Sequence, residues 1–217
     1  MTDQASEQPR HFAEMRAAPR SSLMCRTAKI LCESGEYVCV VRDVSATGAR
    51  LRLFHEPPPD RHLFLELSNG DRYAMERVWT HADHAGFRFS CLIDVDRFIA
   101  EPSAYPRRPI RLTLQRQAEI AIGSDTSLVT VLDLSQQGAR IDADRKLALR
   151  QKLWLAVDGL PRRFGAVRWR KGNAHGLVLQ QGLRLDELAQ HAFALQPFAP
   201  ANLAVAETAQ PASLRYA

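Results

Sequence analysis

A chain of 217 residues with 46% hydrophobic and 24% charged residues can form one large domain or two smaller ones, each with its own core. Its formal net charge of +5 favours an anionic partner only mildly, and leaves nucleic acid, an acidic membrane surface and a phosphorylated small molecule open. No apolar run approaches the roughly 18 residues of a membrane span, and the polar N-terminus lacks the apolar core of a secretion signal. A cytoplasmic protein is therefore expected.

The first half of the chain alternates short apolar runs with turn residues. Ala49–Leu53 reads apolar, polar, apolar, polar, apolar, which is the period of a half-buried strand. Clusters of glycine, proline and acidic residues separate such runs. This pattern predicts a small six-stranded antiparallel barrel with a short helix near residues 94–100. The predicted strands are residues 24–32, 37–44, 49–54, 62–67, 72–81 and 86–91.

The second half repeats this series of strands and ends in a longer helix. The predicted strands are residues 115–122, 128–134, 139–142, 152–157, 163–169 and 176–181. Within residues 184–196, apolar side chains recur at helical spacing, namely Leu185, Leu188, Ala189 and Ala192. The predicted fold class is therefore all-β, with two tandem six-stranded antiparallel barrels, each followed by a C-terminal helix.

An internal repeat explains this symmetry. The phrase Asp-x-Ser-x-x-Gly-Ala-Arg occurs twice at an offset of 90, and a later tryptophan and glycine repeat at the same offset. The recurring pairs are Asp43 and Asp133, Ser45 and Ser135, Gly48 and Gly138, Trp79 and Trp169, and Gly86 and Gly176. Shared spacing over such a length indicates a tandem duplication.

An arginine pair with three residues between its members precedes each copy. The pairs are Arg16 with Arg20 and Arg107 with Arg111, at an offset of 91 that a one-residue deletion in the second copy explains. The predicted domains are residues 12–100 and residues 103–198. Residues 1–11 and 200–217 are expected to be disordered tails.

The recurring residue types suit a guanine nucleotide. Arginine recognises phosphate in a bidentate manner and also matches the O6/N7 edge of guanine. Aspartate can accept hydrogen bonds from guanine N–H groups, and a serine hydroxyl can adapt as donor or acceptor. Taken alone, Gly48 and Gly138 read as turn glycines with positive φ, and the Asp-x-Ser pairs as turn caps. The arginine pair upstream of each copy favours a binding pocket instead.

These residues resemble the PilZ domain, a bacterial receptor module for cyclic di-GMP. Its signature is Arg-x-x-x-Arg followed by Asp/Asn-x-Ser-x-x-Gly, on a six-stranded barrel with a C-terminal helix. The resemblance implies a ligand site in each copy, with the arginines on phosphate and the guanine edge and the aspartate and serine on the same base. The implied residues are Arg16, Arg20, Asp43, Ser45 and Gly48 in the first copy, and Arg107, Arg111, Asp133, Ser135 and Gly138 in the second.

The second arginine pair admits another register. An extra Arg108 follows Arg107, and aligning Arg107 with Arg20 would place Ser103 opposite Arg16. Keeping both arginines needs one gap residue rather than three, so we prefer the register given above. The first copy is expected to be the better ligand site.

Other kinds of site are less well supported. His81 and His84 are replaced by lysine and alanine in the second copy, so we predict no metal. The repeated serines have no recurring histidine, and no phosphate loop, dinucleotide fingerprint or pair of catalytic carboxylates is found, so we predict neither catalysis nor a cofactor. No Cys-x-x-Cys pair occurs, and we interpret the cysteines as small core hydrophobes: Cys25, Cys32, Cys39 and Cys91.

We therefore expect a receptor without catalysis that binds cyclic di-GMP, changes conformation and passes the signal to a protein partner in motility, polysaccharide or regulatory machinery. Arg107 and Arg111 lie in a proline-rich linker, so ligand in the second copy is expected to order this linker and change the interdomain geometry. One alternative is a ligand-independent PilZ-type interaction module. Another is a small basic barrel for nucleic acid, which is not expected because lysines are few and the arginines cluster at the motif.

Overall fold

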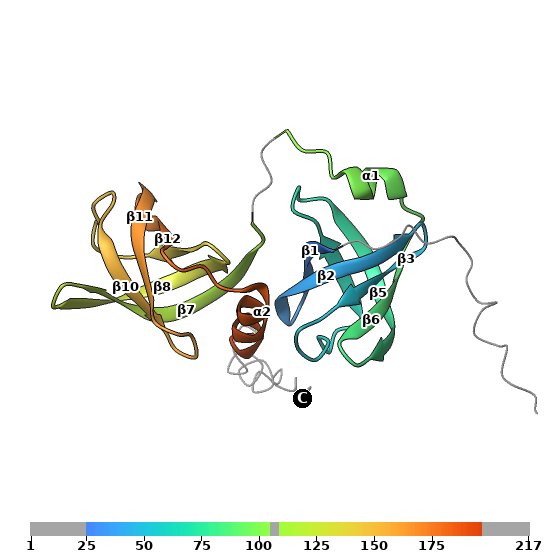
Figure 1. The fold of residues 1–217 in the computed structure, drawn as a ribbon, viewed down its shortest axis with the longest axis horizontal. Coiled ribbons are helices and arrows are strands. Elements are labelled where there is room, and N and C mark those ends of the chain that lie inside the picture. Colours follow the sequence, from blue (N-terminus) through green and yellow to red (C-terminus); the bar gives the residue numbers. More distant parts are fainter. Residues whose placement is uncertain (1–24, 105–108, 197–217) are drawn as a thin grey trace, which may run out of the picture.

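The structure, a computed structural model, describes residues 25–104 and 109–196, which form two closed antiparallel β-barrels (Figure 1). This confirms the predicted all-β fold with a barrel in each half of the chain. The predicted tails, together with Arg16, Arg20 and Arg107, lie outside the described residues.

Each barrel is a single sheet in which the first strand also pairs with the fourth. In the first barrel the order is β1-β2-β3-β6-β5-β4, and in the second β10-β11-β12-β9-β8-β7. The first contains β1 (Arg26–Cys32), β2 (Gly35–Ser45), β3 (Gly48–Arg52), β4 (His62–Glu66), β5 (Arg72–His81) and β6 (His84–Phe89), followed by α1 (Val95–Ala100). The second contains β7 (Arg111–Ile122), β8 (Asp125–Ser135), β9 (Gly138–Asp142), β10 (Lys152–Val157), β11 (Arg163–Lys171) and β12 (Ala174–Leu179), followed by α2 (Leu185–Ala194).

Alternating side chains give each barrel an apolar interior. In β4, Leu63 and Leu65 are buried, whereas His62 and Phe64 face solvent. The inward-facing residues of all six strands pack into one core in each barrel. The two-residue period in the sequence therefore arises because alternate side chains face the interior and the exterior of a closed sheet.

An arginine in the first strand of each barrel holds the helix that follows that barrel. Arg26 Nη1 donates to the carbonyl oxygen of Ile99, at 2.6 Å, and Arg116 Nε donates to that of Leu195, at 3.1 Å. Carbonyls at a helix C-terminus have no partner within the helix, and a cation there also complements the helix dipole. Among the described residues, no helix is long and apolar enough to cross a membrane.

The repeated tryptophan and glycine form a contact on the outside of each barrel. Trp79 and Trp169 are about 40% exposed, and a Cβ atom added at Gly86 or Gly176 would lie closer than 3.0 Å to the indole Nε1 of the tryptophan in the same barrel. The indole therefore lies against the bare backbone of the glycine. This contact explains why the two residue types recur together.

The interpretation of the cysteines as core residues is correct for one of them and wrong for two. Cys39 is fully buried in β2, and Cys32 is partly buried, whereas Cys25 and Cys91 are exposed. Cys25 directly precedes β1 and Cys91 follows the end of β6, so neither points into a barrel. All four thiols are free.

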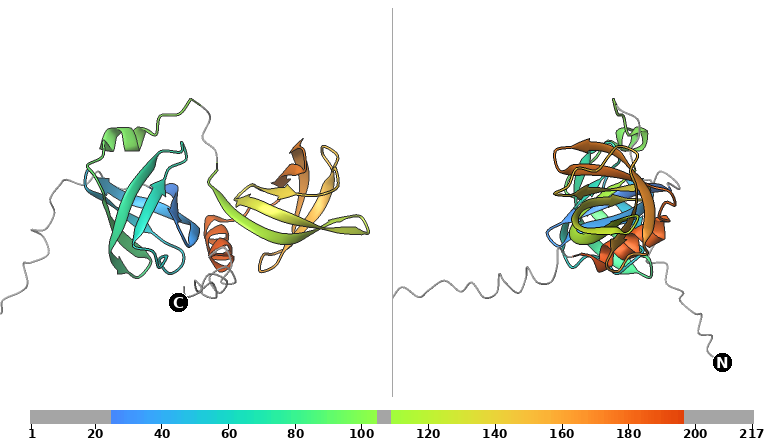
Figure 2. Two further views of the ribbon diagram at one scale, coloured as in Figure 1. Left: turned by 180° about the vertical axis from the view of Figure 1, so that it is seen from behind. Right: turned by 90° about the vertical axis from the view of Figure 1, so that its left-hand side faces the viewer.

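Helix α2 lies between the two barrels and contacts both (Figures 1 and 2). Its Leu188 belongs to the core of the second barrel, whereas Phe193 packs against the core of the first. The Phe193 ring stacks on the imidazole of His55, with ring centroids 4.4 Å apart and an interplanar angle of 9°. One helix therefore closes its own barrel and covers a neighbouring one.

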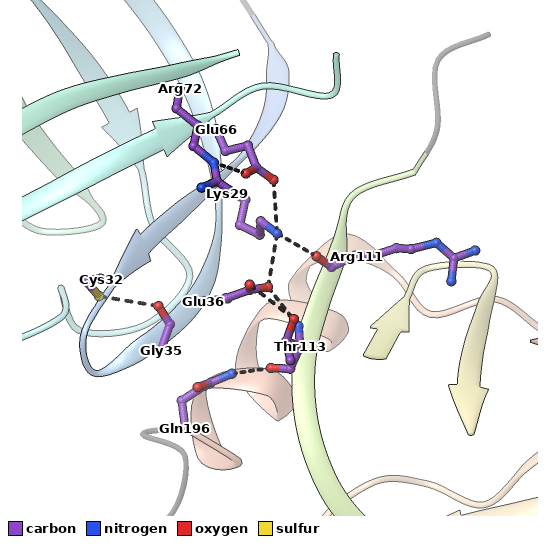
Figure 3. A network of polar contacts seen from close by, with 9 residues as sticks. All are labelled: Lys29, Cys32, Gly35, Glu36, Glu66, Arg72, Arg111, Thr113 and Gln196. Carbon is purple, nitrogen blue, oxygen red and sulfur yellow. Dashed lines mark hydrogen bonds and ion pairs between the residues drawn. The ribbon is translucent and has the colours of Figure 1, made fainter. Parts of the chain in front are cut away.

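A group of polar residues, here called the interdomain polar cluster, joins β1 and β2 to the start of β7 (Figure 3). Lys29 Nζ lies 3.1 Å from Glu36, from Glu66 and from the carbonyl oxygen of Arg111. Glu36 in turn accepts from the backbone N–H and the hydroxyl of Thr113, at 2.8 and 3.2 Å. Arg111 is thus the first residue of a strand that contacts the first barrel, so the prediction that it lies in the proline-rich linker between the barrels is wrong.

His55 is expected to make the contact between α2 and the first barrel sensitive to pH. Burial lowers the pKa of His55 from its ordinary value of 6.5, although its hydrogen bond to the Glu56 carbonyl acts in the opposite direction. Separated from α2, the imidazole gains water and its pKa returns toward 6.5. Docking of α2 should therefore be favoured above pH 6.5 and weaken as the pH falls below that value, because the separated state binds protons more readily.

NMR titration of the His55 ring tests this expectation. The measured pKa should lie below 6.5, and interdomain contact should loosen on acidification in wild-type protein but much less in His55→Phe, which keeps a ring for stacking. A His55 pKa at or above 6.5 would contradict it.

Candidate ligand-binding site

The repeated aspartates hold equivalent positions at the end of β2 and of β8. Asp43 pairs across the sheet with Arg50, and Asp133 with Arg140, each beside a bulge that follows a buried valine. In both barrels the arginine Nε lies 2.7 Å from a carboxylate oxygen of the aspartate. Each aspartate is only 7% exposed, so a fixed carboxylate sits just below the barrel surface.

The second barrel also brings together two residues that the sequence assigned to one site. Arg111 Nη1 donates to Asp133 Oδ1 at 2.9 Å, while Arg140 contacts the other oxygen of the same carboxylate. Arg111 is the first residue of β7 and pairs with Ser135 in the ladder. The end of the arginine motif therefore lies directly on the Asp-x-Ser-x-x-Gly segment.

The repeated serines close the turn that carries the motif. Ser45 Oγ donates to the carbonyl oxygen of Gly48 at 3.2 Å, and Ser135 Oγ donates to that of Gly138 at 3.0 Å. Backbone bonds from the end of β6 and of β12 fasten the same turns. The serine hydroxyl thus has a structural role before any ligand is considered.

The repeated glycines allow two backbones to come close together. Neither Gly48 nor Gly138 has positive φ, so the turn-glycine interpretation of the sequence is wrong. A Cβ atom at Gly48 would lie closer than 3.0 Å to the carbonyl oxygen of Phe87, and one at Gly138 would meet that of Leu177 in the same way. These glycines therefore set how tightly the motif turn packs on the adjacent strand.

Gly138→Ala is expected to destabilise the second barrel by about 1–3 kcal/mol, because the added methyl group meets a backbone atom that cannot rotate away. Urea denaturation would measure the loss. Ser124→Ala, in the exposed turn between β7 and β8, serves as the control and should leave the free energy of unfolding nearly unchanged. Equal stability of the two variants would show that the strands separate at little cost.

Two residues of this site, Arg50 and Arg140, were not predicted from the sequence. Both stand in the repeated phrase, two positions after its glycine, and the strand alternation places them on the same face as the aspartates. The signal was therefore present, because an arginine facing a nearly buried aspartate across two strands forms an ion pair. Their guanidinium groups orient the carboxylates, and the remaining N–H groups of these partly exposed side chains stay at the surface.

A cavity of about 1170 Å³ lies between the first barrel and α2. It is lined by Cys25, Arg42 and Arg52 of the first barrel, among others, and by Arg184 and Gln190 of the second domain. None of the described motif residues named above lines it. Within residues 25–104 and 109–196, no group of three or more His, Cys, Asp or Glu side chains could hold a metal ion.

Comparison with known proteins gives a family match and several similar structures. A family model described as the PilZ domain matches residues 14–99, and no curated protein matches the chain. PlzA of Borreliella burgdorferi, solved in complex with c-di-GMP, is 11% identical, with a TM-score of 0.34 over 77% of this chain and 87% of that one. The inhibitor of motility MotI/DgrA of Bacillus subtilis is 10% identical, with a TM-score of 0.35 over 79% and 96%. YcgR of Escherichia coli, also in complex with c-di-GMP, is 9% identical, with a TM-score of 0.29 over 85% and 87%.

Proposed function

A PilZ domain model matches residues 14–99, and from this match we propose that the chain is a receptor that binds cyclic di-GMP and acts without catalysis. The observation that supports the proposal most directly is the ion pair between Arg111 and Asp133. It joins the arginine motif to the Asp-x-Ser-x-x-Gly motif in the second barrel. The first barrel has the same arrangement of Asp43, its cross-strand arginine and the closed turn.

The proposed chemistry follows from these groups. The carboxylates of Asp43 and Asp133, each held by an arginine, would accept hydrogen bonds from the N–H edge of guanine. Arg111 can exchange a carboxylate for a phosphate or for the O6/N7 edge of the base, because its side chain is about half exposed. Arg16, Arg20 and Arg107 would supply the remaining guanidinium groups.

Transmission of the signal is proposed to pass through the start of β7. The Arg111 guanidinium donates to Asp133. The carbonyl oxygen of Arg111 accepts from Lys29 of the first barrel, and Figure 3 shows the guanidinium extending away from Lys29. Thr113, two residues later, contacts Glu36 on the same barrel. A nucleotide that draws Arg111 away from Asp133 would therefore strain these contacts and shift the two barrels relative to one another. A protein of motility, polysaccharide or regulatory machinery would read the new arrangement.

Calorimetric titration with cyclic di-GMP tests the receptor proposal. We expect binding in the micromolar range or tighter, with two classes of site if both barrels bind, because each barrel presents the motif. GMP, which carries the same base and one phosphate, serves as the control and should bind far more weakly. Folded protein that gives no heat with cyclic di-GMP, or equal heat with GMP, would contradict the proposal.

A further inference from the structure

The two barrels differ in charge. Residues 25–104 contain 10 Lys and Arg against 12 Asp and Glu, whereas residues 109–196 contain 13 against 8. The net positive charge of the described chain therefore comes from the second barrel. A duplicated fold does not require this difference, since both barrels share strand order and motif.

The excess cations gather on one part of the second barrel, here called the basic face. It comprises the loop between β9 and β10, the start of β10 and the end of β11, with Arg145, Lys146, Arg150, Lys152, Arg168, Arg170 and Lys171. At the repeat offset of 90, the first barrel has no lysine or arginine at any of these positions: it has His55, Glu56, Asp60, His62, Val78, Thr80 and His81. The basic face is thus specific to the second copy.

Backbone contacts bring the loop and the strand together. The Arg150 N–H donates to the carbonyl oxygen of Val167 at 2.8 Å, next to Arg168. Arg170 Nη1 donates to the carbonyl oxygen of Leu147 at 3.1 Å, beside Lys146. Cations from two chain segments therefore lie side by side, an arrangement that costs free energy unless anions are nearby.

Within the described residues, the one carboxylate in the loop of the basic face is the exposed Asp144, which forms no ion pair with these cations. None of the seven cations of the basic face forms an ion pair with another described residue. In the first barrel, by contrast, eight of the ten are paired within the described residues: Arg26, Lys29, Arg50, Arg52, Arg61, Arg72, Arg88 and Arg97. The basic face therefore has unused charge available for an external anion.

Apolar side chains indicate which anion fits. Leu149 is 55% exposed near the end of the loop, and Trp169 is 40% exposed on the adjoining strand. Leu149 stands where the first copy has Pro59. A phosphate backbone offers an exposed leucine no apolar contact, whereas the headgroup region of a bilayer accepts both cations and apolar side chains.

The corresponding end of the first barrel is already occupied. Phe193 of α2 stacks on His55, and Arg184 and Leu185 line a cavity with Glu56. In the second barrel the loop residues at these positions are exposed, within the part of the chain that the structure describes. The duplication thus leaves one end of one barrel open for a partner.

We propose that the basic face binds the surface of a bilayer that contains anionic phospholipids. The seven cations would contact headgroup phosphates, and Leu149 and Trp169 would enter the boundary with the acyl chains. This inference does not rest on nucleotide binding, because the basic face contains none of the proposed ligand residues.

Sedimentation of the full chain with vesicles tests the proposal. The vesicles are phosphatidylcholine alone or with about one third phosphatidylglycerol, at low and physiological salt. Wild-type protein should bind the anionic vesicles but not those of phosphatidylcholine alone. The variant Arg145→Gln/Lys146→Gln/Arg150→Gln should lower the partition coefficient for anionic vesicles about a hundredfold. Arg61→Gln/Arg72→Gln/Arg97→Gln removes the same charge from exposed residues of the first barrel and should change it little.

Leu149→Ser separates a membrane from nucleic acid. It should lower vesicle binding about tenfold, because the free energy gained by burying the leucine side chain in the bilayer is lost. Circular dichroism verifies that the variant folds. Fluorescence anisotropy with a short DNA duplex provides the competing measurement. Failure to bind anionic vesicles, equal losses in the two triple variants, or tight duplex binding that Leu149→Ser leaves unchanged would each overturn the proposal.

Discussion

Asp43→Ala protein titrated with cyclic di-GMP is expected to lose its tighter binding phase, and Asp133→Ala protein its weaker one. Each substitution removes a nearly buried carboxylate that would accept from the guanine edge and leaves its cross-strand arginine without an anion. Losing a charge-assisted hydrogen bond in such a position costs about 1.5–3 kcal/mol. The affinity of the affected site should therefore fall roughly ten- to a hundredfold.

The comparison of the two variants also tests which of the two barrels binds the nucleotide more tightly. Asp125→Ala, at the exposed first residue of β8, is the control and should leave both phases unchanged. If Asp133→Ala removes the tighter phase instead, the preference for the first copy is wrong. If neither variant alters binding, the nucleotide does not use these carboxylates and the proposed site must be abandoned.

Much of the fold could be predicted because the sequence contains the same information twice. A strand pattern that occurs once in a sequence is ambiguous, but here Trp79 and Gly86 recur with the same spacing in the other half. In the structure, this tryptophan and this glycine contact one another in each barrel. Asp133 and Arg111 were assigned to one site from motif order alone, and they meet at 2.9 Å. Spacing along strands translates directly into position in a closed barrel.

Contacts between the domains could not be predicted in this way. Alternation shows that Lys29 and Glu36 face outward from their strands, but not which surface meets them. Phe193 resembles any apolar residue of an amphipathic helix, although it packs on the first barrel rather than on its own. Glycine is equally ambiguous, because a sequence does not distinguish a need for positive φ from a need for close approach, and Gly48 serves the second.

Lys29→Met is expected to loosen the interdomain polar cluster and to destabilise the protein by about 3–5 kcal/mol. The Lys29 side chain is 11% exposed, and its ammonium nitrogen lies 3.1 Å from two carboxylates and from the carbonyl oxygen of Arg111. Methionine fills similar space without charge, so Glu36 and Glu66 would be left close together without their cation. Urea denaturation should register the loss, whereas Arg72→Gln, which breaks an exposed pair with Glu66, should cost about 0–1 kcal/mol.

The same variant tests whether the cluster couples ligand binding to interdomain geometry. With the other exposed thiol removed by Cys25→Ser, a label on Cys91 and another at Ser124→Cys report the distance between barrels. In wild-type protein this distance distribution should shift when cyclic di-GMP fills the second site, because Arg111 carries both the ligand contact and the bond from Lys29. In Lys29→Met the distribution should already be broad, and nucleotide should change it much less. A wild-type distribution that stays constant with the second site occupied would mean that β7 does not transmit the signal.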